Sequence, residues 1–220
     1  MLVRPGRAAV FGVLIVLCIC GVAAAAGPSL RSYLLRSGEQ PGYTVTKHSL
    51  VSAHTAAAYV RAEFGPLLTR AQQKAAVRRL KKAGFVGAAG EELHGARKRW
   101  GASAVVAFNN PRSADQLAKL TYKQAVSLYK VVVTVQGGKL SRFALPGIHP
   151  SYGVTVRSKP AADAEVVWVE GDCVLFSAQG LRHGSGLTPR QIATRVTTGA
   201  ESQRARTNGT CPALAATFTG

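Results

Sequence analysis

Hydrophobic and polar positions recur along the chain with two different periods, and together they predict both helices and strands. The helical period is clearest over residues 114–129, where apolar side chains recur every three or four positions and lysines occupy the opposite side. A second helix is predicted over residues 53–64, before Gly65-Pro66. Both helices are expected to cover a sheet or another helix with their apolar sides.

Three helix starts share one capping signature, a hydroxyl residue followed three positions later by glutamine. The pairs are Thr69 with Gln72, Ser113 with Gln116, and Thr188 with Gln191. The first pair predicts a helix over residues 70–83, and the third predicts one over residues 189–198. Each of these two helices is followed by a glycine, Gly84 or Gly199, that suits a left-handed C-terminal cap.

Short runs of alternating or uniformly apolar residues predict the strands. These runs are residues 43–45, 85–93, 102–108, 131–135, 140–145, 154–157, 166–169 and 173–177. Residues 170–172 predict a hairpin turn between the last two strands, and residues 136–139 predict a turn between two others. Strands clustered around three or four helices indicate an α+β fold with a largely antiparallel sheet. A strand followed by a capped helix occurs twice, which suggests two pseudo-equivalent halves.

The N-terminus predicts export from the cytoplasm. Arg4 and Arg7 precede residues 8–26, a run of 19 residues without a charge that ends in small side chains. A basic start, an apolar core and small residues before a cleavage point are the parts of a secretory signal. The run is also close to the roughly 20 residues that span a bilayer. Residues 1–26 are therefore interpreted as a signal peptide or a retained membrane anchor, and residues 27–220 as a single exported domain under either interpretation.

The charge balance is strongly basic, with 28 Lys and Arg residues against 10 Asp and Glu residues and a formal net charge of +18. Such a surface favours an anionic membrane, an envelope polymer or an anionic small ligand. The alternative is a solvated basic surface without a specific partner. The candidate binding residues are Arg70, Lys74, Arg78, Arg79, Lys81, Lys82, Arg97, Lys98, Arg99 and Trp100. Nucleic acid is disfavoured, because export argues against it and no known nucleic-acid-binding motif is present.

Two cysteines lie in the exported part, Cys173 and Cys211. An even number of cysteines in an oxidising compartment predicts one disulfide, which would join the C-terminal tail to the strand that carries Cys173. A metal site is not expected, because no histidine or cysteine stands at ligand spacing from either residue.

No catalytic motif is present. The five histidines are scattered, and Ser185 is not part of the GxSxG pattern of a nucleophile elbow. Glu91-Glu92 and the pair Asp163 and Glu165 are interpreted as solvated charges at turns. The glycines of residues 84–90 follow a helix rather than joining a strand to a helix, so they do not predict a dinucleotide-binding loop. Neither enzymatic activity nor a cofactor is expected.

The chain resembles uncharacterised exported proteins of high-GC Gram-positive bacteria. The similarity rests on residues 33–43 (YLLRSGEQPGY), on Lys82-Ala83-Gly84-Phe85 after a basic helix, and on the strands followed by capped helices. More distantly, it is similar to actinobacterial envelope lipoproteins and to the extracellular sensor domains of receptor serine/threonine kinases. The resemblance implies an α+β domain with a sheet beside helices and a ligand-sized groove. It assigns no role to individual residues.

These features predict a non-enzymatic, extracytoplasmic binding or sensing module of the cell envelope, secreted or anchored by the N-terminal segment. Its expected ligand is an anionic lipid, an envelope polymer or a small molecule. The alternative is a structural or partner-binding accessory protein of the envelope, and a secreted enzyme is a third hypothesis.

Overall fold

The computed structural model describes residues 30–45, 51–65, 68–95, 99–158, 161–182, 188–207, 209 and 211. The predicted signal peptide or anchor, residues 1–26, lies outside these described residues. Within them, no helix is both long enough and apolar enough to cross a bilayer.

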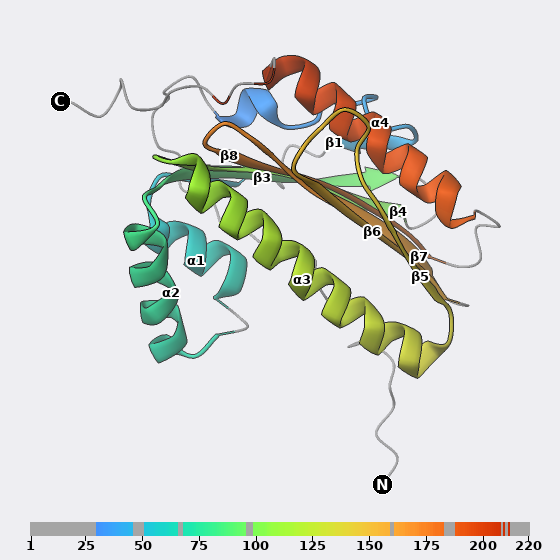
Figure 1. Cartoon of the computed structure of the whole chain (residues 1–220), viewed down its shortest axis with the longest axis horizontal. Coiled ribbons are helices and arrows are strands. Elements are labelled where there is room, and N and C mark those ends of the chain that lie inside the picture. The colour runs from blue at the N-terminus through green and yellow to red at the C-terminus, as the bar shows by residue number, and fades with distance from the viewer. Residues whose placement is uncertain are drawn as a thin grey trace, which may run out of the picture.

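One antiparallel sheet forms the centre of the molecule (Figure 1). Its strands lie in the order β1-β3-β4-β8-β7-β6-β5, and β2 also pairs with β3. The strands are β1 (Tyr43–Val45), β2 (Val51–Ala53), β3 (Phe85–Gly95), β4 (Arg99–Phe108), β5 (Lys139–Phe143), β6 (Ser151–Arg157), β7 (Ala161–Glu170) and β8 (Cys173–Arg182). Every pair of neighbours is antiparallel, which confirms the prediction of a large antiparallel sheet.

Helices cover both faces of this sheet (Figure 1). On one face lie α1 (Ala56–Phe64), α2 (Arg70–Lys82) and α3 (Pro111–Gln136), and on the other lie the short 3₁₀ helix η1 (Leu30–Tyr33) and α4 (Pro189–Thr207). The α+β prediction is thus confirmed. A hairpin followed by a helix occurs twice, as β3-β4-α3 and β7-β8-α4, but the two helices cover opposite faces.

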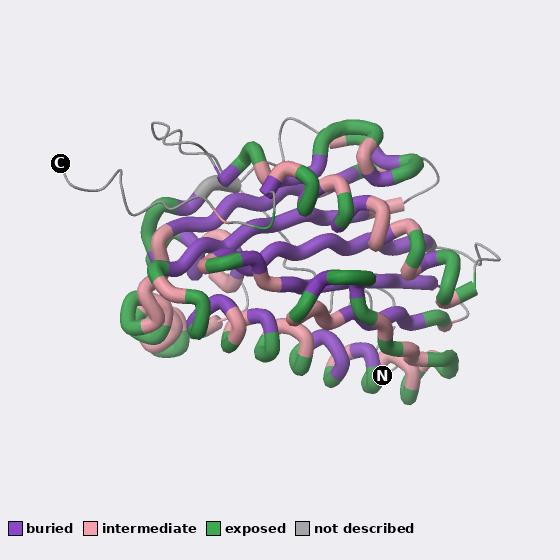
Figure 2. Tube along the Cα trace, turned by 45° about the horizontal axis from the view of Figure 1, so that its top comes forward, coloured by how far each residue is buried: buried purple, intermediate pink, exposed green. Residues whose placement is uncertain are grey.

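Alternation of side chains along the central strands supplies a core on each face. In β4, Val105 and Ala107 pack under α4, whereas Ala104 and Val106 pack under α1 and α3. The central strands are buried along almost their whole length (Figure 2). The core under α4 includes Leu30, Leu34, Val166, Trp168, Leu175, Ile192 and Val196.

Helix α3 differs from the prediction at both ends. It begins at Pro111, because the side chain of Asn110 accepts a hydrogen bond from the Ser113 N–H, so the predicted cap at Ser113 is wrong. It also continues through residues 131–135, for which the sequence predicts a strand, and residues 136–139 therefore join a helix to β5. Val132 and Val133 pack against β6 in this last part. Tertiary packing thus overrides the β-preference of the valines.

Helix α4 continues to Thr207, so the predicted end at Gly199 is also wrong. Gly199 lies where the helix crosses the sheet, and a Cβ atom there would be 3.2 Å from Ser177 Oγ. The glycine therefore permits close packing rather than ending the helix. The capping boxes at Thr69 and Thr188 are confirmed, as is the left-handed Gly84, whose φ is +77°.

The C-terminal end of α4 is fastened to the hairpin between β7 and β8. Cys173 and Cys211 form the expected disulfide, with their Cα atoms 5.5 Å apart. The hydroxyl of Thr207 donates a hydrogen bond to the buried carboxylate of Glu170, which also accepts from the Trp168 indole N–H at 3.0 Å. These contacts hold the chain beyond α4 against the start of β8.

Candidate functional site

Helix α1 separates two surface features on the three-helix face of the sheet. Tyr59 and Glu63 stand four positions apart, on the side of α1 that faces the sheet. Val60 and Arg61 line the other side, toward α2. We call the first feature the apolar slot and the second the basic groove.

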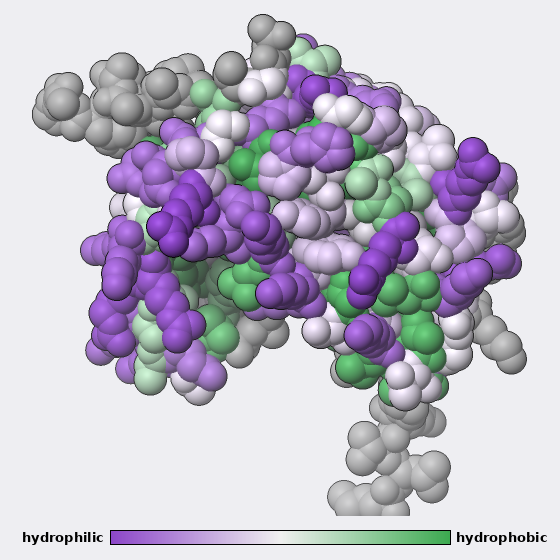
Figure 3. Space-filling view, in the orientation of Figure 1, coloured by the Kyte–Doolittle hydropathy of each residue, from purple (hydrophilic) through white to green (hydrophobic). Residues whose placement is uncertain are grey.

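The apolar slot lies between α1 and the N-terminal half of α3, above β3, β4, β7 and β8. It is lined by Tyr59, Glu63, Ala88, Ala89, Gly90, Ala104, Val106, Leu117, Thr121, Val167, Val174 and Phe176. The sheet leaves space beneath α1, because β3 and β4 carry small residues there, Ala88, Gly90 and Ala104. The resulting cavity measures about 20 Å³, which is room for about one water molecule. The molecular surface is also hollowed between the α1–α2 pair and α3 (Figure 3).

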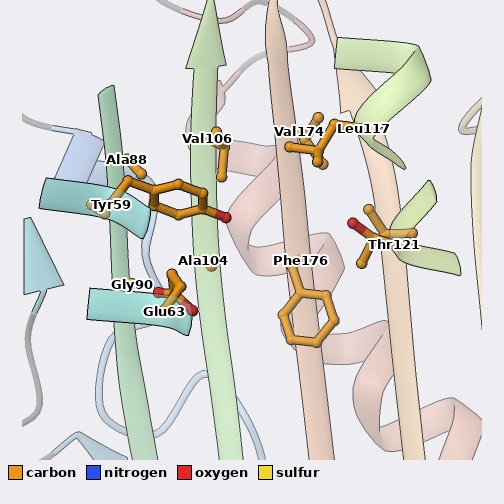
Figure 4. A pocket seen from close by; sticks show the side chains of 12 residues that line it. Tyr59, Glu63, Ala88, Gly90, Ala104, Val106, Leu117, Thr121, Val174 and Phe176 are labelled. Carbon is orange, nitrogen blue, oxygen red and sulfur yellow. The ribbon is translucent and has the colours of Figure 1, made fainter. Parts of the chain in front are cut away.

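Three polar side chains stand around this otherwise apolar slot (Figure 4). The hydroxyl groups of Tyr59 and Thr121 point toward each other from α1 and α3. The carboxyl group of Glu63 lies over Gly90 and Ala104. The slot therefore combines apolar walls with a few groups that can form hydrogen bonds, which is the usual composition of a small-molecule site.

Glu63 is the most unusual of the three. Only 5% of the residue is exposed, and its Oε2 atom has no hydrogen-bond partner among the described residues. Burial raises the pKa of Glu63 to about 8. Its carboxyl group is therefore mostly neutral at pH 7 and can donate a hydrogen bond as well as accept one.

Tyr59 is neutral at pH 7, as a phenol ordinarily is, and its surroundings disfavour ionisation further. Burial, followed by the nearby charge of Glu63 when it ionises, raises the pKa of the Tyr59 phenol. Its ring also packs against Phe85 and Phe64, with centroids 5.3 and 6.1 Å away. The ring contacts fix the direction in which the hydroxyl group points.

The basic groove lies between α1 and α2 and has a volume of about 440 Å³. Its lining residues are Ala57, Val60, Arg61, Arg70, Gln73, Lys74, Val77 and Arg78, which include four cations and no acid. Helix α2 carries six cations and no acid in 13 residues, and none of its side chains is fully buried. Hydrophilic side chains accordingly cover the α2 side of the molecule (Figure 3). The groove is open to solvent and can hold an anionic group of considerable size.

The described residues of the predicted basic set lie in two separate regions, helix α2 and the start of β4. Arg70, Lys74 and Arg78 line the groove, whereas Arg79, Lys81 and Lys82 are exposed in the last turn of α2, outside its lining. Arg97 and Lys98 lie outside the described residues. Arg99 and Trp100 begin β4, where they pair with Gly95 and His94 at the far end of β3. That end is roughly 30 Å from the start of β3 at about 3.3 Å per residue, so the eight described residues of this set do not form one surface.

Three of the four carboxylates interpreted as solvated are buried instead, so that interpretation is wrong for them, whereas Glu92 is partly exposed. Glu91, Asp163 and Glu165 point into the molecule from the strands. Glu91 accepts a hydrogen bond from the Ser103 hydroxyl at 2.8 Å, and burial raises its pKa to about 7. Burial and then the charge of Asp163 raise the pKa of Glu165 to about 8, while the Tyr129 hydroxyl lies 3.4 Å from its Oε2. These groups belong to the packing beneath η1 and α3.

Metal ligands do not gather anywhere in the described part of the chain, where no group of three or more His, Cys, Asp or Glu side chains could hold an ion. Of the histidines, His54, His94 and His149 are exposed, and the other two lie outside the described residues.

Sequence reasoning did not identify Arg61, Glu63 or Thr121. One signal was available for Glu63, an acid four positions after Tyr59 on the apolar side of a predicted helix. The run Gly87-Ala88-Ala89-Gly90 was a second signal, since a strand of small residues leaves space above it. Arg61 could be assigned to the groove only once α1 and α2 were seen to pack side by side.

Comparison with known proteins found no matching family model and no matching curated protein sequence. One similar solved structure is the extracellular domain of PknH from Mycobacterium tuberculosis, with a TM-score of 0.45 and 13% sequence identity. The match covers 84% of this chain and 100% of that domain. The TM-score is below 0.5, so the neighbour's role is not transferred to this chain.

Proposed function

We propose that the protein is a non-enzymatic, extracytoplasmic binding module that holds the anionic headgroups of a lipid surface in its basic groove. The observation that carries this proposal is the groove itself, which has four cations and no acid among its described lining residues. Each base near an anionic bilayer contributes about 1 kcal/mol of attraction. The open shape suits headgroups presented at a surface.

A location outside the cytoplasm rests on two features of the chain. Residues 1–26 have the pattern of a signal peptide or anchor, and the Cys173–Cys211 disulfide belongs to an oxidising compartment. The absence of enzymatic activity is part of the proposal.

Binding to vesicles tests this function. Residues 27–220 are expected to sediment with vesicles of phosphatidylglycerol and phosphatidylcholine but not with phosphatidylcholine alone. Binding should be lost at about 1 M salt, where the screening length is about 3 Å. Equal sedimentation with both kinds of vesicle, or binding that salt does not weaken, would contradict the proposal. If soluble polyphosphate bound as tightly as the anionic vesicles, the ligand would be an anionic polymer and not a lipid surface.

A second candidate, a partner-binding accessory protein, is favoured by one observation. Helix α3 exposes three large apolar side chains, Leu120, Val131 and Val135, with relative exposures of 52%, 57% and 73%. Exposed apolar residues on one helix are typical of an interaction surface. A photo-crosslinker at residue 135 would support this candidate if it captured one envelope protein in cells. Crosslinks spread evenly over many proteins would count against this candidate.

A further inference from the structure

We infer that the apolar slot is a second binding site, for a slender uncharged aliphatic molecule that carries one hydroxyl or carbonyl group. This inference does not depend on the basic groove, because the two features lie on opposite sides of α1. It rests on a polar group that is buried without a partner among the described residues, and on a lining that is apolar almost everywhere else.

The Oε2 atom of Glu63 has no hydrogen-bond partner in the described part of the chain. An unsatisfied buried polar group destabilises the folded state, and an apolar residue of similar shape would avoid this cost. A ligand with a hydroxyl or carbonyl group at this point would supply the missing hydrogen bond.

The slot combines an apolar lining with a few polar side chains. Val106, Leu117, Val174 and Phe176 form apolar walls, and Tyr59 and Thr121 are the remaining polar groups. These walls suit methylene groups, and the three polar side chains suit one neutral hydrogen-bonding group. An anionic ligand would lose its hydration without gaining an opposite charge, because no cation is among the lining residues. A cationic ligand would require the buried carboxyl group of Glu63 to ionise, which its desolvation disfavours.

The slot can widen. The cavity of about 20 Å³ admits the polar end of a ligand, and a longer chain requires α1 to move away from α3. The buried side chains of α1 are Ala56, Tyr59, Val60 and Glu63, and α2 contributes none. A pair of helices held by so few buried side chains belongs to the less stable part of a fold, where opening costs least.

The test uses 1-octanol as the probe and the methyl resonances of Val106, Leu117 and Val174 as the readout, in residues 27–220. We expect saturable shifts at these methyl groups and not at Val156, which packs beneath the C-terminal half of α3. Octanoate and octane are expected to bind at least tenfold more weakly, because octanoate is charged and octane has no polar group.

Variants at Glu63 decide whether the carboxyl group matters. Glu63→Leu should weaken octanol binding about tenfold, equivalent to about 1.4 kcal/mol, whereas Glu63→Gln should stay within about threefold of the original protein, because it keeps the hydrogen bonds. Thr121→Val provides a milder change, and Glu201→Gln, an exposed position on α4, is the matched control. Both Glu63 variants should leave binding to anionic vesicles unchanged, which separates this site from the groove.

Two results would overturn the inference. One is the absence of saturable shifts at the slot methyl groups. The other is equal octanol affinity in the original protein and in Glu63→Leu, which would make the slot a packing defect. Denaturant unfolding distinguishes a loss of binding from a loss of folding, because Glu63→Leu should unfold at no lower urea concentration than the original protein.

Discussion

The free energy of unfolding is expected to fall by several kcal/mol as the pH rises from about 5 to about 8. Burial raises the native-state pKa values of Glu63 and Glu165 to about 8 and of Glu91 to about 7, from the ordinary value of 4.5. Between these limits the folded chain holds protons that the unfolded chain has released. Stability therefore decreases with rising pH, by up to about 1.4 kcal/mol per pH unit for each group.

Urea unfolding at about pH 5, 6, 7 and 8 measures this effect, because these pH values cover the range of the pKa shifts. The stabilisation from the three protonated acids is fully present below about pH 4.5 and is lost as the pH passes about 7 to 8. Glu63→Gln, Glu91→Gln and Glu165→Gln should each flatten the dependence, whereas Glu201→Gln at an exposed position should not. Stability that is constant or rises over this range would show that these acids are ionised in the folded protein.

Loss of the disulfide is expected to lower the free energy of unfolding by about 3–4 kcal/mol. The Cys173–Cys211 bond closes a loop of about 39 residues that contains β8 and α4, and the chain-entropy model gives this value for a loop of that length. Urea unfolding of the Cys173→Ala, Cys211→Ala double variant at constant pH measures it. The variant should also become insensitive to reducing agent.

The original protein provides the matching comparison for the disulfide. Dithiothreitol should shift its unfolding curve toward that of the double variant. Coincident curves for the oxidised and reduced original protein would contradict the expected contribution. Cys173 is almost completely buried, so each alanine also removes a small amount of packing.

The fold could be predicted from the sequence wherever local signals agreed with the final packing. The capping boxes at Thr69 and Thr188 are local, since hydroxyl, glutamine and backbone meet within three residues, and both helices begin as expected. The hairpin between β7 and β8 likewise carries its own turn, in which Gly171 has a φ of +55°. Alternation along the strands was enough to indicate an antiparallel sheet.

Errors arose where distant contacts decided the outcome. Residues 131–135 have the composition of a strand, and only packing of Val132 and Val133 on β6 keeps them helical. In the sequence, Gly199 resembles a residue that ends a helix. In the fold it lies against Ser177, whose Oγ is 3.2 Å from the point that a Cβ atom would occupy. Glu91, Asp163 and Glu165 look like surface charges, because the residues that bury them come from other strands and helices.

The candidate sites were predicted less completely. The cations of α2 were visible in the sequence, but the groove also needs Arg61 from α1, a contact that only the tertiary structure supplies. The slot depends on four strands and two helices meeting, and on small residues at Ala88, Gly90 and Ala104 that leave space between them. The sequence carries these small residues without indicating which helix lies above them.

The most direct test of the central claim compares two double variants of α2 that carry the same net charge. Arg70→Gln with Lys74→Gln removes two cations from the groove, whereas Arg79→Gln with Lys82→Gln removes two from outside its lining. At about 1 kcal/mol per base, the groove variant should bind phosphatidylglycerol vesicles about 30-fold more weakly than the original protein. The control variant should lose much less. Equal losses in both variants would contradict the account, because binding would then follow total charge and not the groove.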